Sequence, residues 1–373
     1  MKPETTKKTP KCRILYLVGQ LGPGGLERQL VSILETIDKQ RYLPVVVVWN
    51  FNDKDIYVDP IRALGVEILS LSGTYGSIGK LLSFGLLARK LDPEVIHSYS
   101  FFTNFAAYWG KILTRAVAIG ALQSDFLTEK KVSGMFLGRL SSRWPEVHIS
   151  NNFLAAENVK STRSLFVPQK LFIVRNGLDL TKFQKKDFAH HRKPIILAIG
   201  SLLPVKRWDR LIKAVFNLKE AGQNFVLKIV GEGPMRSSLE KQAEAFQLGG
   251  WIEFLGYRKD IPALLADSQF LVHTSDREGC PNAITEAMAC GRAVIATNVG
   301  DVPYLVEEGK TGFVVEPQDI AALTVKMNTL MKNVELSRQM GNAGRLKAER
   351  EFGLDRLIGE TLAVYRAAGW SDK

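Results

Sequence analysis

Apolar and polar residues along the first half of the chain predict strands that alternate with helices. Apolar runs of about four to seven residues suit buried strands, and apolar residues spaced three or four apart suit helices. The expected strands are 13–18, 44–49, 66–71, 95–97, 116–122, 147–150 and 171–174, and the expected helices are 26–38, 80–90 and 104–113. Such alternation favours a parallel α/β sheet.

The pattern breaks at residues 176–179, and a polar segment that contains His190 and His191 follows before the pattern starts again. The second half predicts strands at 194–199, 225–230, 251–255, 270–274 and 293–297, and helices at 208–221, 235–246, 261–266, 282–290, 319–350 and 354–368. We therefore predict two Rossmann-like domains, residues 12–178 and 179–353. A disordered basic tail at 1–11 precedes them, and a helical segment at 354–373 follows.

The composition is that of an ordinary globular protein. The chain has 373 residues, of which 46% are hydrophobic and 24% charged, so two domains with real cores are expected. No apolar run approaches the ~18 residues of a membrane-spanning helix, and a cytoplasmic location is expected. The three cysteines, Cys12, Cys280 and Cys290, lack metal-ligand spacing and predict reduced thiols without a structural zinc site.

Positive charge is concentrated in the first half. Residues 1–178 hold 23 Lys and Arg against 14 Asp and Glu, a net charge of +9 within the total of +12. Nucleic acid, an anionic membrane or a phosphorylated substrate would suit such a surface, and plain solvated charge explains it equally well. The basic stretch 80–90 suits peripheral contact with the inner face of a membrane, although packing of its apolar side on the sheet is the ordinary alternative.

The strongest candidate site lies in residues 276–291. The expected strand 270–274 leads into a Gly/Pro turn at the carboxyl end of the sheet, where open α/β sheets bind ligands. Asn282 is a suitable N-cap for the helix that follows. The backbone N–H groups of Ala283 and Ile284 would then face an incoming anion.

Two carboxylates bracket this helix start. Glu278 lies in the turn and Glu286 about one turn into the helix. One acid could then accept hydrogen bonds from ribose hydroxyls while the other faces a hexose. For either glutamate alone, a capping turn with surface acids is the ordinary interpretation. Lys206 follows a strand and a glycine-containing loop and can reach a phosphate, although most loop lysines are simply surface residues.

The pattern E-G-x-P-N-x-x-x-E-A-M-A-x-G, which begins at Glu278, resembles the signature of the retaining GT-B glycosyltransferases of family four, also called group one. Other stretches resemble loops and framework segments of that family: 22–28, 149–152, 173–179, 200–209, 231–236 and 255–260. The resemblance covers nearly the whole chain and is strongest in its second half.

The resemblance implies a GT-B fold, in which two Rossmann-like domains face each other across a cleft and the segment 354–373 crosses back to pack on the N-terminal domain. Residues 12–178 would bind the acceptor and residues 179–353 the donor nucleotide. The implied reaction moves a hexosyl unit, with retention, from a UDP or GDP sugar to a hydroxyl of a glycan, lipid-linked or small-molecule acceptor. Neither cofactor nor metal is expected, and the implied setting is bacterial cell-surface glycan or glycolipid synthesis.

The resemblance also implies roles for individual residues. Lys206, on the donor diphosphate, and Glu278 are the expected catalytic residues. Expected donor contacts come from Gly24, Gly25, Ser201, Lys206, Tyr257, Asn282, Ala283, Ile284 and Glu286. Two departures from the family matter. Ser201 stands where many members have an arginine, for which Arg207 could compensate, and the loop 122–125 lacks a histidine that many members place near the reacting carbon.

The remaining motifs are weaker. The glycines in 19–25 have the wrong spacing for a dinucleotide fingerprint. Residues 53–55 spell D-x-D, but turn chemistry explains them better. Adjacent histidines at 190 and 191 rarely share a metal, and His97 suits a structural role better than a catalytic one. A sugar-nucleotide epimerase or phosphorylase and a non-catalytic anion-binding module remain alternatives, whereas nucleic-acid binding lacks the interleaved aromatic residues that it needs.

Overall fold

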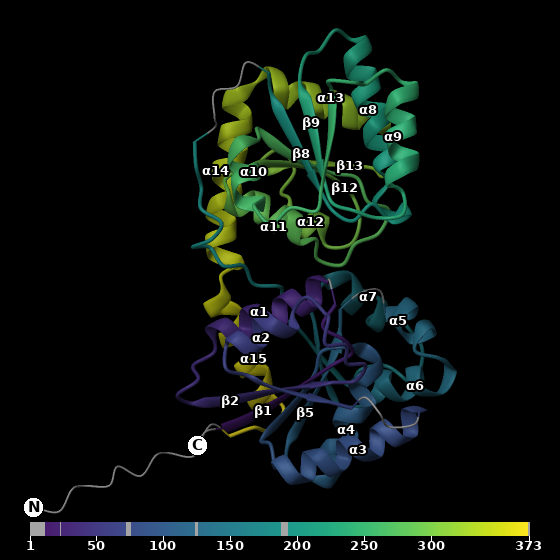
Figure 1. Cartoon of the computed structure of the whole chain (residues 1–373), viewed down its shortest axis with the longest axis vertical. Helices are drawn as coiled ribbons and strands as arrows, with labels where there is room; N and C mark the ends of the chain where they lie inside the picture. The colour runs from purple at the N-terminus through teal and green to yellow at the C-terminus, as the bar shows by residue number, and fades with distance from the viewer. Residues whose placement is uncertain (1–11, 23, 72–75, 124–125, 188–192, 372–373) are drawn as a thin grey trace, which may run out of the picture. The chain divides into compact units, whose positions relative to one another are not determined.

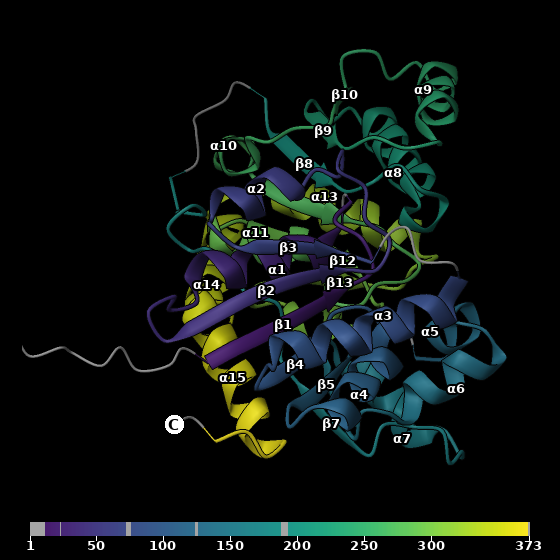
Figure 2. The ribbon, with the colours of Figure 1, turned by 60° about the horizontal axis from the view of Figure 1, so that its bottom comes forward.

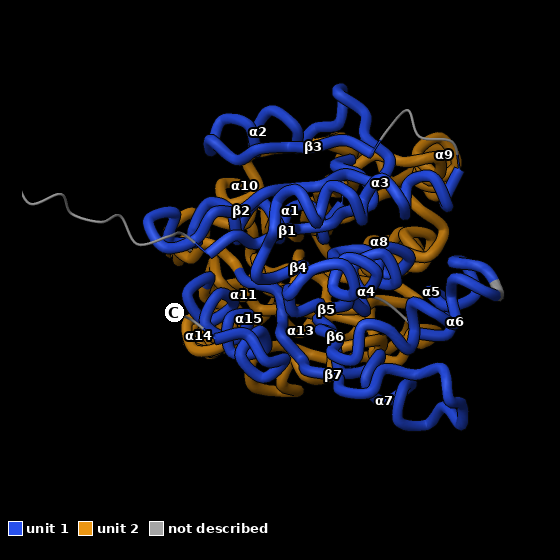
Figure 3. Tube along the Cα trace, turned by 90° about the horizontal axis from the view of Figure 1, so that it is seen from below, with its two compact units in different colours: residues 1–177, 354–373 blue, residues 178–353 orange. Residues whose placement is uncertain are grey.

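A computed structural model gives the structure of residues 12–371 except 23, 72–75, 124–125 and 188–192. The tail 1–11 and the pair at 190 and 191 therefore lie outside the described residues. The chain forms two compact units (Figure 3): unit 1 comprises residues 1–177 and 354–373, and unit 2 comprises residues 178–353.

Within the described residues, unit 1 contains a seven-stranded parallel sheet in the order β3-β2-β1-β4-β5-β6-β7. Its strands are β1 (Cys12–Val18), β2 (Tyr42–Val48), β3 (Glu67–Ser70), β4 (Val95–Ser98), β5 (Val117–Leu122), β6 (Val147–Ser150) and β7 (Lys170–Ile173). Figure 2 shows β3, β2, β1 and β4 side by side. Strands β1 and β2 are buried almost throughout because helices cover both faces of the sheet.

The helices of unit 1 lie on both sides of this sheet. They are α1 (Gly25–Thr36), α2 (Val58–Ala63), α3 (Gly76–Leu91), η1 (Phe101–Thr103), α4 (Asn104–Leu113), α5 (Phe126–Val132), α6 (Met135–Arg143), α7 (Phe153–Ser161) and α15 (Leu354–Ala367). Figure 1 shows α1 and α15 on one side of the sheet and α3 and α4 on the other. The short helices α2, α5, α6 and α7 were not predicted from the sequence.

Helix α15 completes the core of unit 1, although it follows unit 2 in the sequence. Tyr365 and Trp370 are buried in the same apolar cluster as residues of α1, β1 and β2. The Tyr365 hydroxyl lies 2.8 Å from Nδ1 of His97, and Trp370 Nε1 donates to a Glu94 carboxylate oxygen at 3.0 Å. The last helix therefore belongs structurally to the N-terminal half of the chain.

The described residues of unit 2 form a six-stranded parallel sheet in the order β10-β9-β8-β11-β12-β13. Its strands are β8 (Ile195–Ile199), β9 (Val226–Val230), β10 (Ile252–Gly256), β11 (Phe270–His273), β12 (Ala293–Thr297) and β13 (Gly312–Val315). The strand order reverses between β8 and β11, as it does between β1 and β4 in unit 1. Both sheets are of the Rossmann type, which confirms the predicted fold class, and ligands bind such sheets at the carboxyl ends of strands beside the reversal.

The helices of unit 2 are η2 (Pro204–Lys206), α8 (Trp208–Glu220), α9 (Arg236–Ala245), α10 (Ile261–Asp267), α11 (Asn282–Ala289), α12 (Val302–Leu305), α13 (Ile320–Lys332) and α14 (Val334–Glu351). The helical stretch expected at 319–350 consists of two helices, because it is divided at Asn333. The Asn333 side chain accepts a hydrogen bond from the backbone of Leu336 at 2.9 Å and so begins a new helix. Nowhere in the described part of the chain is a helix both long and apolar enough to cross a membrane.

Candidate functional site

The loops after β8 and β11 meet at the point where the strand order of unit 2 reverses. The backbone N–H of Asp276 donates to the Val205 carbonyl at 2.8 Å. The Thr274 hydroxyl donates to the carbonyl of Lys206 at 3.0 Å. These two bonds bring Lys206 and Glu278, which are 72 residues apart in sequence, into one site.

Arg207 stabilises the contact between the loops after β8 and β11. Its backbone has φ of 51°, which turns the chain sharply between η2 and α8. Its guanidinium donates to Asp209 at 2.9 and 2.8 Å and to Asp276 at 3.0 Å, and these hydrogen bonds raise its pKa. Arg210 also pairs with Asp276. Arg207 therefore serves the loop, and compensation for Ser201, which the sequence left open, would require it to leave both carboxylates.

Three donors converge on one oxygen of Glu278. Its Oε1 pairs with the Lys206 ammonium, accepts from the Ser275 hydroxyl at 2.6 Å and lies 3.0 Å from Nε2 of His273. Burial alone would raise the pKa of this carboxyl, since its side chain is only 12% exposed. The hydrogen bond from His273 and the charge of Lys206 outweigh burial and lower the pKa to about 2. Glu278 is therefore an anion at neutral pH.

His273 is a residue of this site that the sequence did not identify. It ends β11, its side chain is 4% exposed, and its Nδ1 has no hydrogen-bond partner among the described residues. The nitrogen that faces Glu278 thus provides its main polar contact. The signal available in the sequence was a histidine at a strand end, five residues before the predicted glutamate.

The start of α11 differs from the prediction in two respects. Pro281, in an extended conformation, is the residue before the helix, and Asn282 is the first helical residue. The side chain of the residue before the helix makes no capping hydrogen bond. Proline suits this position because it has no N–H group to leave unsatisfied. The N–H of Ile284 donates to the Pro281 carbonyl at 3.1 Å, so it does not face an anion as expected. The N–H of Ala283 remains the candidate.

The other predicted donor residues of unit 2 lie at strand ends or on α11. Glu286 is buried on α11 with 2% exposure, whereas Tyr257, just after β10, is 65% exposed. Ser201 is an exposed residue just after β8. The structure joins Lys206 to Glu278 in an ion pair, and the roles of the other residues remain predictions.

Two glycines hold the loops of unit 2 close together. A Cβ on Gly231 would lie 1.9 Å from the carbonyl oxygen of Gly200, and a Cβ on Gly300 would lie 2.1 Å from that of Glu278. Both glycines have positive φ, 142° and 53°. Substitution at Gly300 would therefore displace the backbone that carries Glu278.

The predicted glycine loop of unit 1 is fixed by an aspartate. Gly24 is the extended residue before α1 and Gly25 is the first residue of α1. Asp55 accepts from the N–H of Leu21 at 2.9 Å, and Asp53 pairs with Arg62 at 2.8 Å. The D-x-D motif thus supports the loop, as turn chemistry predicts. In the described part of the chain, no group of three or more His, Cys, Asp or Glu residues could hold a metal ion.

A pocket lies at the carboxyl edge of the sheet of unit 1. It is lined by Leu26, Gln29, His97, Tyr99, Gln123, Ile149, Asn151, Val174, Asn176, Leu357 and Thr361. Burial lowers the pKa of His97 to about 3, so the ring is neutral and suits a structural role with Tyr365. Gln123 is the described residue of the 122–125 loop that reaches this pocket. The pocket thus offers amides and hydroxyls rather than ions.

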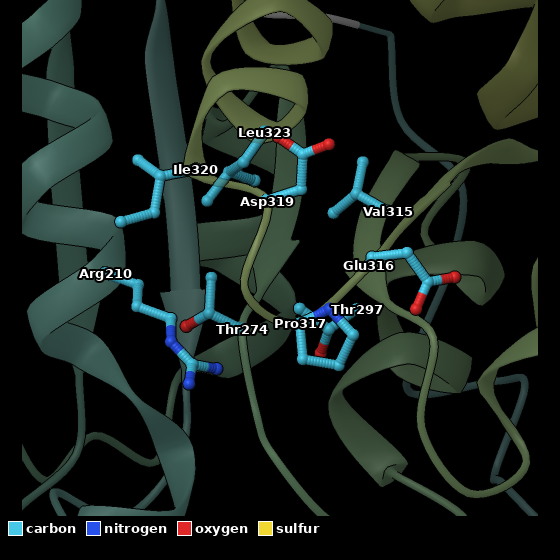
Figure 4. A pocket seen from close by; sticks show the side chains of 9 residues that line it. All are labelled: Arg210, Thr274, Thr297, Val315, Glu316, Pro317, Asp319, Ile320 and Leu323. Carbon is cyan, nitrogen blue, oxygen red and sulfur yellow. The ribbon is translucent and has the colours of Figure 1, made fainter.

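Unit 2 also has a small pocket between α8 and α13, lined by both apolar and polar residues. Figure 4 shows its lining: Arg210, Thr274, Thr297, Val315, Glu316, Pro317, Asp319, Ile320 and Leu323. None of these nine residues was predicted as part of the site. Because Lys206 and Glu278 form an ion pair beside the strand reversal, we assign the candidate site to them and not to this pocket.

The sequence of unit 2 matches a known family. Residues 180–347 match the sequence model described as "Glycosyl transferases group 1". The chain is similar to an uncharacterized glycosyltransferase of Haemophilus influenzae, with 26% identity over 361 residues that cover 93% of this chain and 98% of that protein. It is also similar to the N,N'-diacetylbacillosaminyl-diphospho-undecaprenol alpha-1,3-N-acetylgalactosaminyltransferase of Campylobacter jejuni, with 26% identity over 76% of this chain and 81% of that protein.

Solved structures share the fold over nearly the whole chain. HepE from Anabaena, solved in complex with UDP and glucose, superposes with a TM-score of 0.79 at 19% identity, covering 95% of this chain and 99% of that one. At this level of identity the likeness is one of fold.

Proposed function

We propose that this chain, which has the GT-B fold and whose residues 180–347 match the model of the group 1 glycosyltransferases, transfers a hexosyl unit from a nucleoside diphosphate sugar to a hydroxyl group with retention. The observation that carries the proposal is the Lys206–Glu278 pair at the strand reversal of unit 2. A fixed cation beside a fixed carboxylate suits a ligand that has a diphosphate at one end and sugar hydroxyls at the other.

The donor in this proposal is a UDP or GDP sugar, and HepE with UDP supports the first choice. The diphosphate and Glu278 compete for one ammonium group, so Lys206 turns to the phosphate when the donor binds. His273 and Ser275 then keep Oε1 of Glu278 in place. This leaves the second carboxylate oxygen for a hydroxyl of the hexose. Glu286 is assigned to the ribose.

The chemical step breaks the bond between the anomeric carbon and the diphosphate and forms a bond to the acceptor oxygen on the same face of the ring, while the acceptor hydroxyl gives its proton to the departing diphosphate. Negative charge gathers on the departing phosphate, and positive charge near it lowers the barrier. Lys206 and the N–H of Ala283 are the groups that we assign to this task. On this proposal a divalent metal is not required.

The acceptor is proposed to be a glycan or a lipid-linked sugar of a bacterial cell surface, reached from the cytoplasmic side of the membrane. The name of the Campylobacter jejuni relative, which specifies a diphospho-undecaprenol acceptor, supports this choice. The pocket of unit 1 supports it further, since its neutral amides and hydroxyls suit sugar hydroxyls better than ionic groups.

A thermal-shift screen against UDP, GDP, ADP and their sugars tests the donor assignment. A ligand at 100 times its Kd stabilises the protein by ~2.7 kcal/mol, which is readily detected. Lys206→Ala should lose the shift with the preferred nucleotide, and Lys219→Ala, which removes another lysine of unit 2, should keep it. Nucleotide should then be released from the preferred donor only when an acceptor is present. Release at full rate without an acceptor, with the sugar isomerised or phosphorylated, would favour an epimerase or a phosphorylase.

A further inference from the structure

Helix α3 has apolar residues on both of its faces. One face packs against α4 through small and aromatic residues: Phe84, Gly85 and Ala88. A Cβ on Gly85 would lie 2.6 Å from both Trp109 and Leu113 of α4, so the two helices are in close contact. A surface helix normally has polar residues on the face that is turned away from the core. In α3 that second face is apolar as well.

The second face carries three large aliphatic side chains at intervals of four. Ile78, Leu82 and Leu86 are 76%, 55% and 69% exposed. Residues four apart lie one above another on a helix, so the three side chains form a continuous stripe. Single exposed aliphatic residues are common on proteins, but a row of three on one helix marks an interaction surface.

The charges of α3 suit an anionic partner. Lys80, Arg89 and Lys90 are its charged residues, and the helix contains no acid. Lys80 does not contribute, because its ammonium donates to the Trp49 carbonyl and to Asn50 at 2.7 Å each. Arg89 and Lys90, both exposed, lie at the end of the helix three and four residues after Leu86. The cations thus sit beside the apolar stripe.

The same combination recurs on the next helical pair of unit 1. Val132, at the end of α5, is 81% exposed and Phe136, in α6, is 75% exposed. Lys131 and Arg139 are exposed beside them in sequence. Among the described residues, twelve of the eighteen large apolar side chains that are largely exposed belong to unit 1. Apolar and cationic surface therefore accumulate on the same unit.

We propose that unit 1 binds the surface of an anionic lipid bilayer through α3, with Ile78, Leu82 and Leu86 inserted below the headgroups. Arg89 and Lys90 then lie at the level of the lipid phosphates. An apolar stripe bordered by cations is what an interfacial helix requires, whereas a polar protein partner would leave the stripe uncovered. The inference concerns a surface outside the donor site, so it does not depend on the identity of the donor.

Sedimentation with phosphatidylcholine vesicles, with and without phosphatidylglycerol, tests the proposal. The protein should sediment with the anionic vesicles only. The triple variant Ile78→Gln/Leu82→Gln/Leu86→Gln should bind at least about tenfold more weakly, and Arg89→Gln/Lys90→Gln should lose about as much. The matched control is Val325→Gln/Val334→Gln/Leu346→Gln, which removes exposed aliphatic residues of unit 2 and should bind like the wild type.

A labelled variant tests the same surface without removing the stripe. The native cysteines are buried, so a dye on Leu82→Cys reports that position selectively. Its emission should shift to the blue with anionic vesicles, and a dye on Leu346→Cys should not respond. Absence of vesicle binding by the wild type, equal binding by the stripe variant, or a dimer that the stripe variant dissociates would each overturn the proposal, the last in favour of a second copy as the occupant.

Discussion

The two units share one strand order around the reversal of their sheets, but they place opposite kinds of side chain there. In unit 1, His97 on β4 lies among the rings of Tyr16, Tyr99 and Tyr365, all buried and uncharged. In unit 2, the loops after β8 and β11 hold an ammonium and a carboxylate, Lys206 and Glu278. The backbone topology is therefore compatible with either chemistry.

The two units differ in how they offset the free-energy cost of burying an ionisable side chain. Burial lowers the pKa of His97 to about 3, so that the ring stays neutral and adds to the core. Glu278 stays ionised because His273 and Lys206 offset its burial and lower its pKa to about 2. A buried charge must be paired. A buried cation that is paired with a carboxylate can exchange this partner for an anionic ligand. We therefore expect unit 2 to suit a phosphate and unit 1 to suit a neutral group.

A fall in pH should give the largest difference between the two units, because it should lower the stability of unit 1 more than that of unit 2. Burial lowers the pKa values of His97 and His148 in unit 1 to about 3 and about 4. Each pKa lies below its unfolded value of 6.5, so unfolding takes up protons and stability falls as the pH falls from 6.5 towards the folded pKa. At about pH 5 each histidine should cost unit 1 about 2 kcal/mol, or about 4 kcal/mol together.

Unit 2 should resist the same acid. The pKa of Glu278 falls from 4.5 to about 2 on folding, so its contribution is present above 4.5 and is lost only as the pH falls from 4.5 towards 2. Urea unfolding followed by dithiodipyridine labelling of Cys12 in unit 1 and of Cys280 and Cys290 in unit 2 measures the units separately. His97→Gln and His148→Gln should each reduce the acid loss of unit 1 by about 2 kcal/mol. Equal losses in both units would contradict the comparison.

Removal of the Lys206 ammonium, the cation of the candidate site in unit 2, should have the next largest effect. Lys206→Ala should lower turnover by about 10²–10³, as loss of a group that stabilises developing charge does in other enzymes. Turnover at saturating donor is the measurement. Arg338→Ala removes an exposed cation of the same unit that pairs with Glu335, and it should leave turnover unchanged. Near-normal turnover of Lys206→Ala would remove the pair from the reaction.

The two glutamates should then divide between binding and turnover. Glu278→Gln should mostly lower kcat, since we assign it to the reacting hexose, and Glu286→Gln should mostly raise the donor KM. A hydrogen bond to an ionised group is worth ~1.5–3 kcal/mol, so each loss should be roughly tenfold or more.

Steady-state kinetics with melting temperatures measured in parallel decide between the site and a capping turn. If both variants lose melting temperature and activity together, and nucleotide stabilises them as much as the wild type, the glutamates only fix the turn.

Chelation should have the smallest effect. If Lys206 and the start of α11 supply the positive charge, EDTA should leave turnover unchanged, and added magnesium or manganese should not raise it. An activity that EDTA abolishes and a divalent ion restores would show that unit 2 needs a further cation beside Lys206.

The sequence was sufficient for the architecture, because the periods of strands and helices are local. The strands of both sheets, except β13, and most long helices lie where the pattern predicts them. The short helices α5 and α6 were missed because some of their exposed residues, such as Val132 and Phe136, are apolar. The apolar residues of these helices therefore do not show the spacing of three or four that predicts a helix. The division at Asn333 was missed because one hydrogen bond from a side chain decides it.

The sequence proposes individual residues for the candidate site, whose roles remain predictions, but it does not give the geometry of the site. The motif identified Lys206 and Glu278 separately, and the pairing depends on hydrogen bonds between two loops far apart in sequence. The assignment of Asn282 as the cap failed because a neighbouring proline already takes that position. His273 was missed because only the folded turn brings its ring to the glutamate.

The position of α15 also has a consequence for the order in which the protein is made. Tyr365 and Trp370 complete the core of unit 1, yet the ribosome delivers them only after the whole of unit 2. Domains usually fold as units, the N-terminal one first, as they emerge during synthesis. Here the second unit is complete in sequence while the first still lacks its last helix. Throughout that interval the nascent chain exposes the surface of α1 that α15 will cover, which makes this surface a natural place for a chaperone to act.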